Sequence, residues 1–236
     1  VSSFTLIFVS TVTNSKYTVS LINAVSTGNN NNITDSSSSN HTITANNRQA
    51  GTFSPYRHAG YSTRVTGNDR LEASGFTISG SWTFEFWYKL PTGVSLDNYQ
   101  TIASFGQSNG TNCRLFRMMQ DPSTKFAFDF SGGGGAQNFY THTATYNQDQ
   151  WYHICATYDA TANTEKVYID GTEVYSVSFT ANYTGVTTAM IGQERTDSST
   201  LAGTPKGKGI FRDFHVIGNA AVAPAAVVPA AGAPAA

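Results

Sequence analysis

The sequence predicts an all-β fold built from two packed antiparallel sheets, and three observations support this. From residue 61 onward, short runs of alternating apolar and polar residues are bounded by Gly, Asn, Asp, Ser and Pro, as in sandwiches and barrels. The dipeptide Asp170-Gly171 between two such runs is a hairpin signal, because a tight turn needs the positive φ that Gly accepts. Helical periodicity is nearly absent, and only one short helical turn is expected after Asp97.

The stretch WYHICATYDATANTEKVYIDGTEV, residues 151–174, predicts the centre of one sheet. Because side chains alternate between the two faces of a strand, Ile154, Ala156 and Tyr158 should share one face, and Val167 and Ile169 one face of the next strand. A third run follows over residues 174–179. The pattern predicts a three-stranded meander over 151–179, which needs a second sheet to bury its apolar face.

The run SWTFEFWYKL, residues 81–90, has the same two-residue period. Its even positions carry only aromatic side chains and are expected to face the core. Glu85 and Trp87 lie on the opposite face. The core-facing residues are Trp82, Phe84, Phe86 and Tyr88.

Three parts of the chain are expected. Residues 1–40 read as an N-terminal extension, with a β-hairpin formed by SSFTLIFVSTV and KYTVSLINAV and a polar linker over 26–40. The first run lacks the basic region and cleavage site of a signal peptide, so it is interpreted as a strand. Residues 41–220 should form the sandwich, and residues 221–236 an Ala/Pro-rich C-terminal arm.

The composition excludes two classes of partner. Charged residues make up 12% of the chain and the net charge is −1, without a basic segment, which argues against nucleic acid as a partner. No apolar run is long enough for a transmembrane helix, so membrane insertion is not expected. Cys113 and Cys155 are compatible with a disulfide or with two small buried side chains.

The residues needed for hydrolysis are not found in pairs. A glycoside hydrolase needs two carboxylates facing one cleft, and no same-face acidic pair occurs near Glu85. Glu85 is therefore expected to be a structural hydrogen-bond acceptor. His153 and His215 lie in strand patterns and should be packed and hydrogen-bonded. No local histidine pair has metal-site spacing, and we expect no enzymatic activity.

Three segments together resemble a known domain family. They are FTISGSWTFEFWYKLP with TIASFG (76–106), WYHICATYD with KVYIDGTEV (151–174), and IGQE with GKGIFRDFHVIGNAAVAP (191–224). Their order resembles the laminin-G-like, concanavalin-A-type jelly-roll domain, whose closing strand carries an acid at the position of Asp213. The resemblance implies a two-sheet antiparallel jelly-roll sandwich.

Residues 35–74 further resemble the segment that precedes such domains in structural proteins of tailed, notably marine, phages. This implies a non-enzymatic virion-surface protein, most concretely a capsid decoration or cement protein. Its partners would be the major capsid protein or other virion proteins, and its own copies in a homo-oligomer such as a trimer. The alternative is a tail or fibre adhesin that binds host surface glycans. A polysaccharide depolymerase is a third hypothesis, which the lack of paired acids disfavours.

Candidate ligand-binding residues are aromatic and amide side chains in polar loops, where sugars stack and form hydrogen bonds. The same composition also occurs in the loops of sandwiches that bind nothing. No cofactor is assigned with certainty, but the family resemblance makes Ca²⁺ a candidate, which requires six to eight oxygen ligands. The candidate ligand-binding residues are Asn109, Asn112, Asn138, Tyr140 and Tyr183, and the candidate metal ligands are Asp69 and Asp197.

Overall fold

The architecture of the chain is all-β. The computed structural model describes residues 18–24, 33–46, 49–51, 62–67, 69–95, 99–106, 114–121, 123–131, 137–178, 186–193 and 207–218. These residues form sixteen strands, and none of them forms a helix that could span a membrane. The prediction of an all-β fold is confirmed, whereas the helical turn expected after Asp97 and the C-terminal arm lie outside the described residues.

The first sheet has nine strands, and the pairings between them are antiparallel. Its main path runs through β14 (Thr172–Ser178), β13 (Thr164–Ile169), β12 (Trp151–Asp159), β7 (Trp82–Lys89), β16 (Lys208–Gly218), β1 (Thr18–Ala24) and β2 (Ile33–Asp35). Off this path, β5 (Ser62–Thr66) pairs with β16 and with β4 (Gln49–Gly51).

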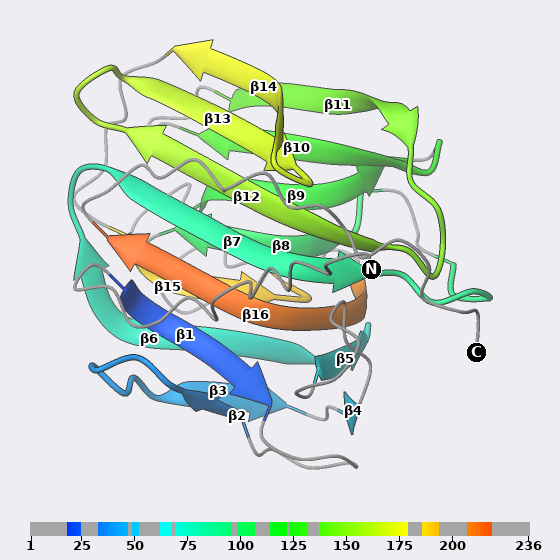
Figure 1. Ribbon diagram of the computed structural model, residues 1–236, viewed down its shortest axis with the longest axis horizontal. Helices are drawn as coiled ribbons and strands as arrows, with labels where there is room; N and C mark the ends of the chain where they lie inside the picture. Colours follow the sequence, from blue (N-terminus) through cyan, green and yellow to red (C-terminus); the bar gives the residue numbers. More distant parts are fainter. Residues whose placement is uncertain are drawn as a thin grey trace, which may run out of the picture.

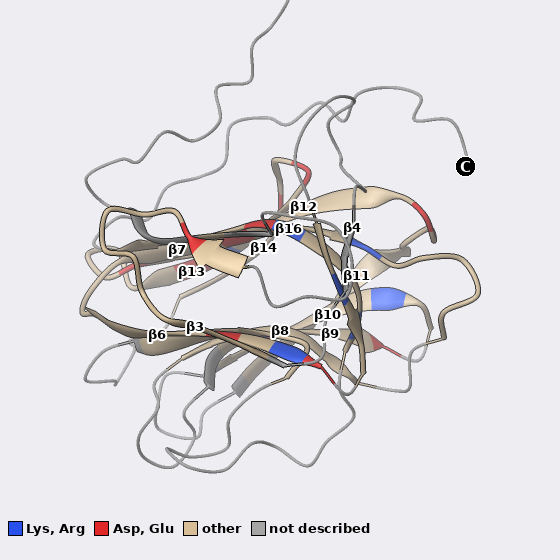
Figure 2. Cartoon of the chain, turned by 90° about the horizontal axis from the view of Figure 1, so that it is seen from below, with Lys and Arg blue, Asp and Glu red and all other residues tan. Residues whose placement is uncertain are grey.

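The second sheet has seven strands, also antiparallel. Its order is β11 (Gln137–Thr145), β10 (Lys125–Ser131), β9 (Arg114–Asp121), β8 (Thr101–Gly106), β15 (Val186–Ile191), β6 (Arg70–Ile78) and β3 (Ile43–Asn46). Figure 2 shows the two sheets as separate layers packed face to face. The predicted two-sheet antiparallel sandwich is confirmed.

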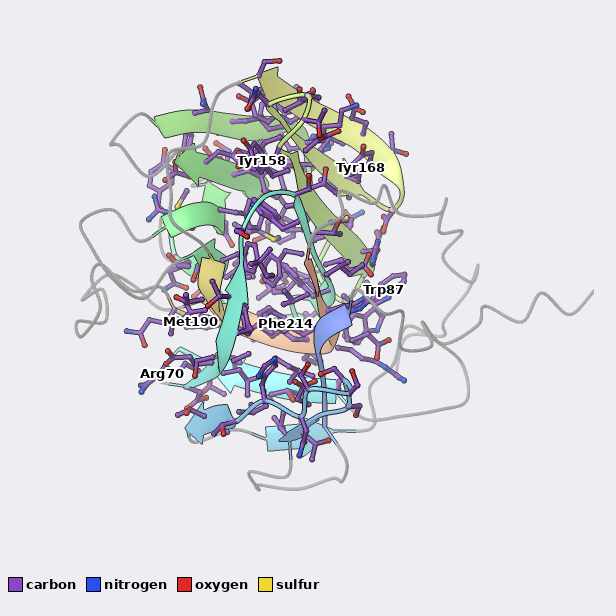
Figure 3. The ribbon with its side chains drawn as sticks, turned by 90° about the vertical axis from the view of Figure 1, so that its left-hand side faces the viewer. Arg70, Trp87, Tyr158, Tyr168, Met190 and Phe214 are labelled. Atoms are coloured by element: carbon purple, nitrogen blue, oxygen red, sulfur yellow. The ribbon has the colours of Figure 1, made fainter. Side chains whose placement is uncertain are left out.

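The core lies between the two layers and is rich in aromatic rings. The four aromatic side chains on the even positions of β7 are buried in it, as their spacing predicts. Phe84 stacks on Phe105 of the opposite sheet with ring centroids 5.1 Å apart. In Figure 3, Phe214 and Tyr158 lie between the sheets, whereas Trp87 and Tyr168 lie on the outer side of the nine-stranded sheet. Aromatic contacts across the layers therefore hold the sandwich together.

The predicted meander is formed by β12, β13 and β14. Asp170 and Gly171 connect β13 to β14 with φ values of +50° and +79°, as a type I′ turn requires. Asp170 also links the turn to β12, since its Oδ1 accepts a hydrogen bond of 2.8 Å from the His153 backbone nitrogen. The inward-facing residues of these strands belong to the core cluster, so the predicted faces are confirmed.

The N-terminal strands form part of the sandwich, which corrects the predicted boundary at residue 40. β1 pairs with β16, with Leu21 opposite His215, and β2 pairs with β1 (Figure 1). The segment 26–40 was expected to be a linker without buried residues, yet Ile33 and Asp35 of β2 are buried. Asp35 is accommodated because its carboxylate accepts hydrogen bonds from the backbone nitrogens of Ser37 and His41, both 2.9 Å. The first half of the predicted N-terminal hairpin lies outside the described residues.

Two segments that the sequence suggests as separate strands, RLEAS and FTIS, form the single strand β6. Gly75 joins them with a φ of +93°, which an L-residue adopts only with strain. The pairing of β6 with β15 shifts its register at this point. A glycine bulge therefore lets the strand continue across a signal that resembles a turn.

Candidate functional site

The structure places two of the five predicted ligand-binding residues on β11, the edge strand of the seven-stranded sheet. Asn138 and Tyr140 are half-buried there, opposite Phe130 and Phe128 of β10. The Tyr140 ring stacks on Tyr175 of β14 with ring centroids 4.4 Å apart and an angle of 11°. One face of Tyr140 is thus covered by protein. Asn109, Asn112 and Tyr183 lie outside the described residues, so their role stays a prediction.

Two exposed aromatic side chains form a pair beside this strand. Phe139 and Tyr99 are 49% and 45% exposed, and they are the exposed large hydrophobic residues among those the structure describes. Their ring centroids lie 5.9 Å apart in an edge-to-face arrangement. Phe139 is adjacent to Tyr140 in β11, so it points to the opposite face, away from the core. Tyr99 reaches it from the turn before β8.

The backbone of Tyr99 is held in an unusual conformation. Its φ is +56°, in the left-handed region that bulky residues rarely adopt. The Tyr99 nitrogen donates a 2.8 Å hydrogen bond to the carbonyl of Gln120, at the end of β9. Such strain persists only where surrounding structure imposes it, and it is common at functional sites. Here it directs a large aromatic ring into solvent.

A row of mostly buried side chains continues from Phe139 across the outer face of the sheet. Asp129 lies directly opposite Phe139, and Arg117 is opposite Asp129 on the next strand. Their side chains form an ion pair of 2.8 Å, with the Asp129 side chain almost fully buried. The positive charge of Arg117 partly compensates the negative charge of Asp129 at this position. The cross-strand row then runs through Ser104, Met190 and Glu72 to Thr44.

The structure gives Asp69 a role in a turn. Asp69 is buried, and its Oδ2 accepts hydrogen bonds from the backbone nitrogen of Thr66 (2.8 Å) and from the Thr66 hydroxyl. No three His, Cys, Asp or Glu side chains gather into a metal-binding group within the described part of the chain. Asp197 lies outside that part. A calcium site involving either residue therefore stays a prediction.

A second polar cluster lies on the outer face of the nine-stranded sheet, around Glu85. His215 Nδ1 is 2.9 Å from Glu85 Oε1, and His153 Nε2 is 3.4 Å from Glu85 Oε2. Strand pairing explains this arrangement, because Glu85 of β7 lies between His215 of β16 and Cys155 of β12. The prediction is confirmed for Glu85 as an acceptor and for His215; His153 is packed beside Glu85, but its Nδ1 has no hydrogen-bond partner among the described residues. Cys155 is a buried free thiol.

The electrostatics of this cluster keep Glu85 charged. Burial raises the pKa of Glu85, but hydrogen bonds and positive charge from His153 and His215 outweigh burial and lower it to about 2. Nearby Asp213 lies at an irregularity of β16 with a φ of +47° and is ion-paired to Arg212 at 3.3 Å. Burial raises the pKa of Asp213, and the Arg212 charge opposes this shift. An ionised Glu85 whose two oxygens are both engaged is unsuited to donate a proton at neutral pH.

Neither member of the exposed pair was among the predicted ligand-binding residues. Phe139 lies between the predicted Asn138 and Tyr140, in a segment whose composition suits sugars. Tyr99 gave no signal, because its position depends on a positive φ and on a hydrogen bond to a distant strand. The short turn expected after Asp97 was the one sequence signal in this region.

Comparison with known families decides the classification. A family model described as the concanavalin A-like lectin/glucanases superfamily matches residues 62–221. The chain belongs to this superfamily. A search among curated proteins found no match for this superfamily member.

Solved structures share the superfamily fold of this chain. The botulinum neurotoxin serotype C1 binding domain superposes with a TM-score of 0.60 at 13% identity, covering 86% of this chain and 49% of that one. The binding domain of botulinum neurotoxin DC in complex with SialylT gives a TM-score of 0.60 at 14% identity, covering 86% and 47%. The same domain in complex with rat synaptotagmin II gives a TM-score of 0.60 at 13% identity, and the match covers 86% of this chain and 48% of that one. The chain spans about half the length of these structures.

Proposed function

We propose that this chain is a non-enzymatic carbohydrate-binding module, and that Tyr99 and Phe139 form its sugar-binding platform. The observation that carries the proposal is the exposure of both rings in one edge-to-face pair, with strain at Tyr99 that core packing does not explain. The apolar face of a pyranose ring packs on such rings, while amides and backbone groups bind its hydroxyls.

Two further facts agree with carbohydrate binding. The superfamily description names lectins and glucanases. One similar structure is a complex with SialylT, and the cell entry of botulinum neurotoxin type C, another structurally similar protein, depends on interaction with two ganglioside molecules. Those ligands belong to those proteins, and for this chain they indicate which probes to test first.

The test is a glycan-array screen followed by titration of the best ligand. The wild type is expected to bind at least one glycan, and Tyr99→Ala and Phe139→Ala should each weaken binding about three- to tenfold, since an aromatic contact contributes about 0.5–1.5 kcal/mol. Phe139→Tyr is the matched control, because it keeps the ring face and should keep the affinity. A wild type that binds no glycan, or alanine variants that bind like the wild type, would refute the proposal.

The role of calcium and the absence of catalysis are tested on the same ligand. Binding is measured with Ca²⁺ and after its removal by a chelator, and a loss on chelation would support the candidate ligand Asp197. Hydrolysis of the bound glycan is assayed in parallel. Hydrolysis that Glu85→Gln abolishes would show that the chain is an enzyme.

Attachment to a virion shell is the second candidate function. The segment that resembles phage structural proteins, residues 35–74, contributes β3 at the edge of the seven-stranded sheet and β4, whose one partner among the described strands is β5. Edge strands accept a strand from another subunit, which would be a major capsid protein, another virion protein or another copy in a trimer. Electron microscopy of particles with labelled antibody tests this. Label over the head supports decoration, label on tail or fibres supports an adhesin, and unlabelled particles contradict both.

A further inference from the structure

One side of the sandwich is closed by aromatic stacking between two edge strands. β11 ends the seven-stranded sheet and β14 ends the nine-stranded sheet, and they lie next to each other (Figure 1). Tyr140 of β11 and Tyr175 of β14 stack with centroids 4.4 Å apart, and Tyr175 also stacks on Phe130 at 5.8 Å. These ring contacts connect the β13–β14 hairpin to the opposite sheet.

Glu165 of β13 is buried beside this closure. It is 1% exposed and lies in the cross-strand row between Tyr158 of β12 and Val177 of β14. Its Oε2 has no hydrogen-bond partner among the described residues. A buried carboxylate oxygen without a partner disfavours the charged form, so the closed sandwich favours the neutral acid at Glu165.

The groups around Glu165 do not stabilise its charge. Burial, and then the negative charge of Asp129, raise the pKa of Glu165 well above its ordinary range. Burial also raises the pKa of Tyr175, and Glu165 and Tyr140 raise it further. On β11, burial and the charge of Lys125 lower the pKa of His142, so this histidine is neutral at neutral pH.

The neighbours of Glu165 along β13 and on β12 complete this environment. Lys166 points to the opposite face of β13, where its Nζ is 2.8 Å from Glu173 Oε2. Tyr158 of β12 directs its hydroxyl to Asn163 Oδ1 at 3.3 Å. The positive charge of Lys166 is therefore engaged by Glu173.

We propose that Glu165 is a pH-operated latch for the β13–β14 hairpin. As the neutral acid it allows the hairpin to close on β11, and its ionisation opens the hairpin and separates Tyr175 from Tyr140. The Glu165 carboxyl group binds its proton more tightly in the closed state than in the open state, where the group is exposed to solvent. Closure is therefore complete below the ordinary pKa of Glu, and the open fraction grows by up to about tenfold per pH unit until the raised pKa is passed.

Hydrogen–deuterium exchange of the full chain tests the latch. Exchange of peptides within residues 164–178 is measured from pH 5 to pH 9 for the wild type and for Glu165→Gln, which keeps the shape but cannot ionise. Comparing the two at each pH removes the intrinsic pH dependence of exchange. The ratio of wild-type to variant rates should rise with pH, by up to about tenfold per unit, and peptides of β7 should show a constant ratio. Glu173→Gln, on the same hairpin but exposed, is the matched control and should follow the wild type.

The outcomes distinguish the latch from other causes. A constant ratio between pH 5 and pH 9 in the hairpin peptides would overturn the proposal, as would Glu173→Gln behaving like Glu165→Gln. If Glu165→Gln does not fold, Glu165→Met replaces it, and the near-ultraviolet circular dichroism of the wild type provides a second measurement. That tyrosine signal should decrease reversibly as pH rises, and a signal that is unchanged up to pH 9 would contradict the latch.

Discussion

Nδ1 of His215 lies 2.9 Å from the carboxylate of Glu85, joining two residues that are 130 positions apart in the chain. With His153 on the other side, this contact places one ionised acid between two imidazoles on the outer face of the nine-stranded sheet. Three strands that are distant in sequence, β7, β12 and β16, meet at this acid. The cluster therefore makes the stability of the sheet depend on pH.

Acid should destabilise the protein through Glu85. Its pKa is lowered from 4.5 to about 2 in the folded chain, so the stabilisation is present above 4.5 and is lost as pH falls from 4.5 to 2. The shift corresponds to roughly 3 kcal/mol. Urea unfolding of the wild type and Glu85→Gln at pH 7 and pH 3 measures this. The difference in unfolding free energy between them should shrink at pH 3, and a difference independent of pH would contradict the assignment.

Tyr99→Gly should be more stable than Tyr99→Ala by about 1 kcal/mol, because only glycine adopts the φ of +56° without a steric penalty. Both variants lose the exposed ring, and glycan binding should weaken equally in both. Thermal unfolding and ligand titration of the two variants measure the two effects separately. Equal melting temperatures would show that the backbone at Tyr99 is not strained.

Gly171→Val should destabilise the fold by about 1–2 kcal/mol, since φ at this position is +79° in the hairpin turn between β13 and β14. Thr172→Val, at the next position but in extended strand, is the control and should change the unfolding free energy little. Chemical denaturation provides the comparison. If both valine variants unfold alike, the turn does not determine the stability of the hairpin.

Asp129→Ala should lower the free energy of unfolding by about 3–5 kcal/mol, because it removes the carboxylate that lies 2.8 Å from Arg117 in a largely buried site. The surface pair of Lys166 and Glu173 has the same 2.8 Å separation but is about 40% exposed on both sides. Glu173→Ala should therefore cost less than about 1 kcal/mol. Unfolding free energies of the two variants test whether burial, and not distance, decides the effect.

Local patterns in the sequence were sufficient for much of the fold. The alternation in 82–89 and 151–169 identified the core-facing residues of β7, β12 and β13, because the two-residue period depends only on the strand itself. Asp170-Gly171 identified its turn for the same reason. The placement of β1 could not be predicted, since its partner β16 lies almost 200 residues away and pairing leaves no local signal.

The candidate sites were only partly predictable from the sequence, because they too depend on contacts between distant strands. Glu85, His153 and His215 were each interpreted as packed and hydrogen-bonded, but their common contact depends on the order of β12, β7 and β16 in the sheet. Tyr99 was missed because a non-glycine residue with positive φ has no reliable sequence pattern. Glu165 was not recognised as buried either, since an acid in an alternating strand is expected to face water.

The position of β1 beside β16 also determines when the protein can fold during its synthesis. The ribosome makes β1 first and β16 last among the described strands, so the nine-stranded sheet lacks its central connection until β16 has emerged. The seven-stranded sheet has all its strands once β15 has been made. Its apolar face then stays exposed to solvent until the nine-stranded sheet is complete. In a cell, that interval is when aggregation competes most strongly with folding, and slow translation before residue 208 would lengthen it.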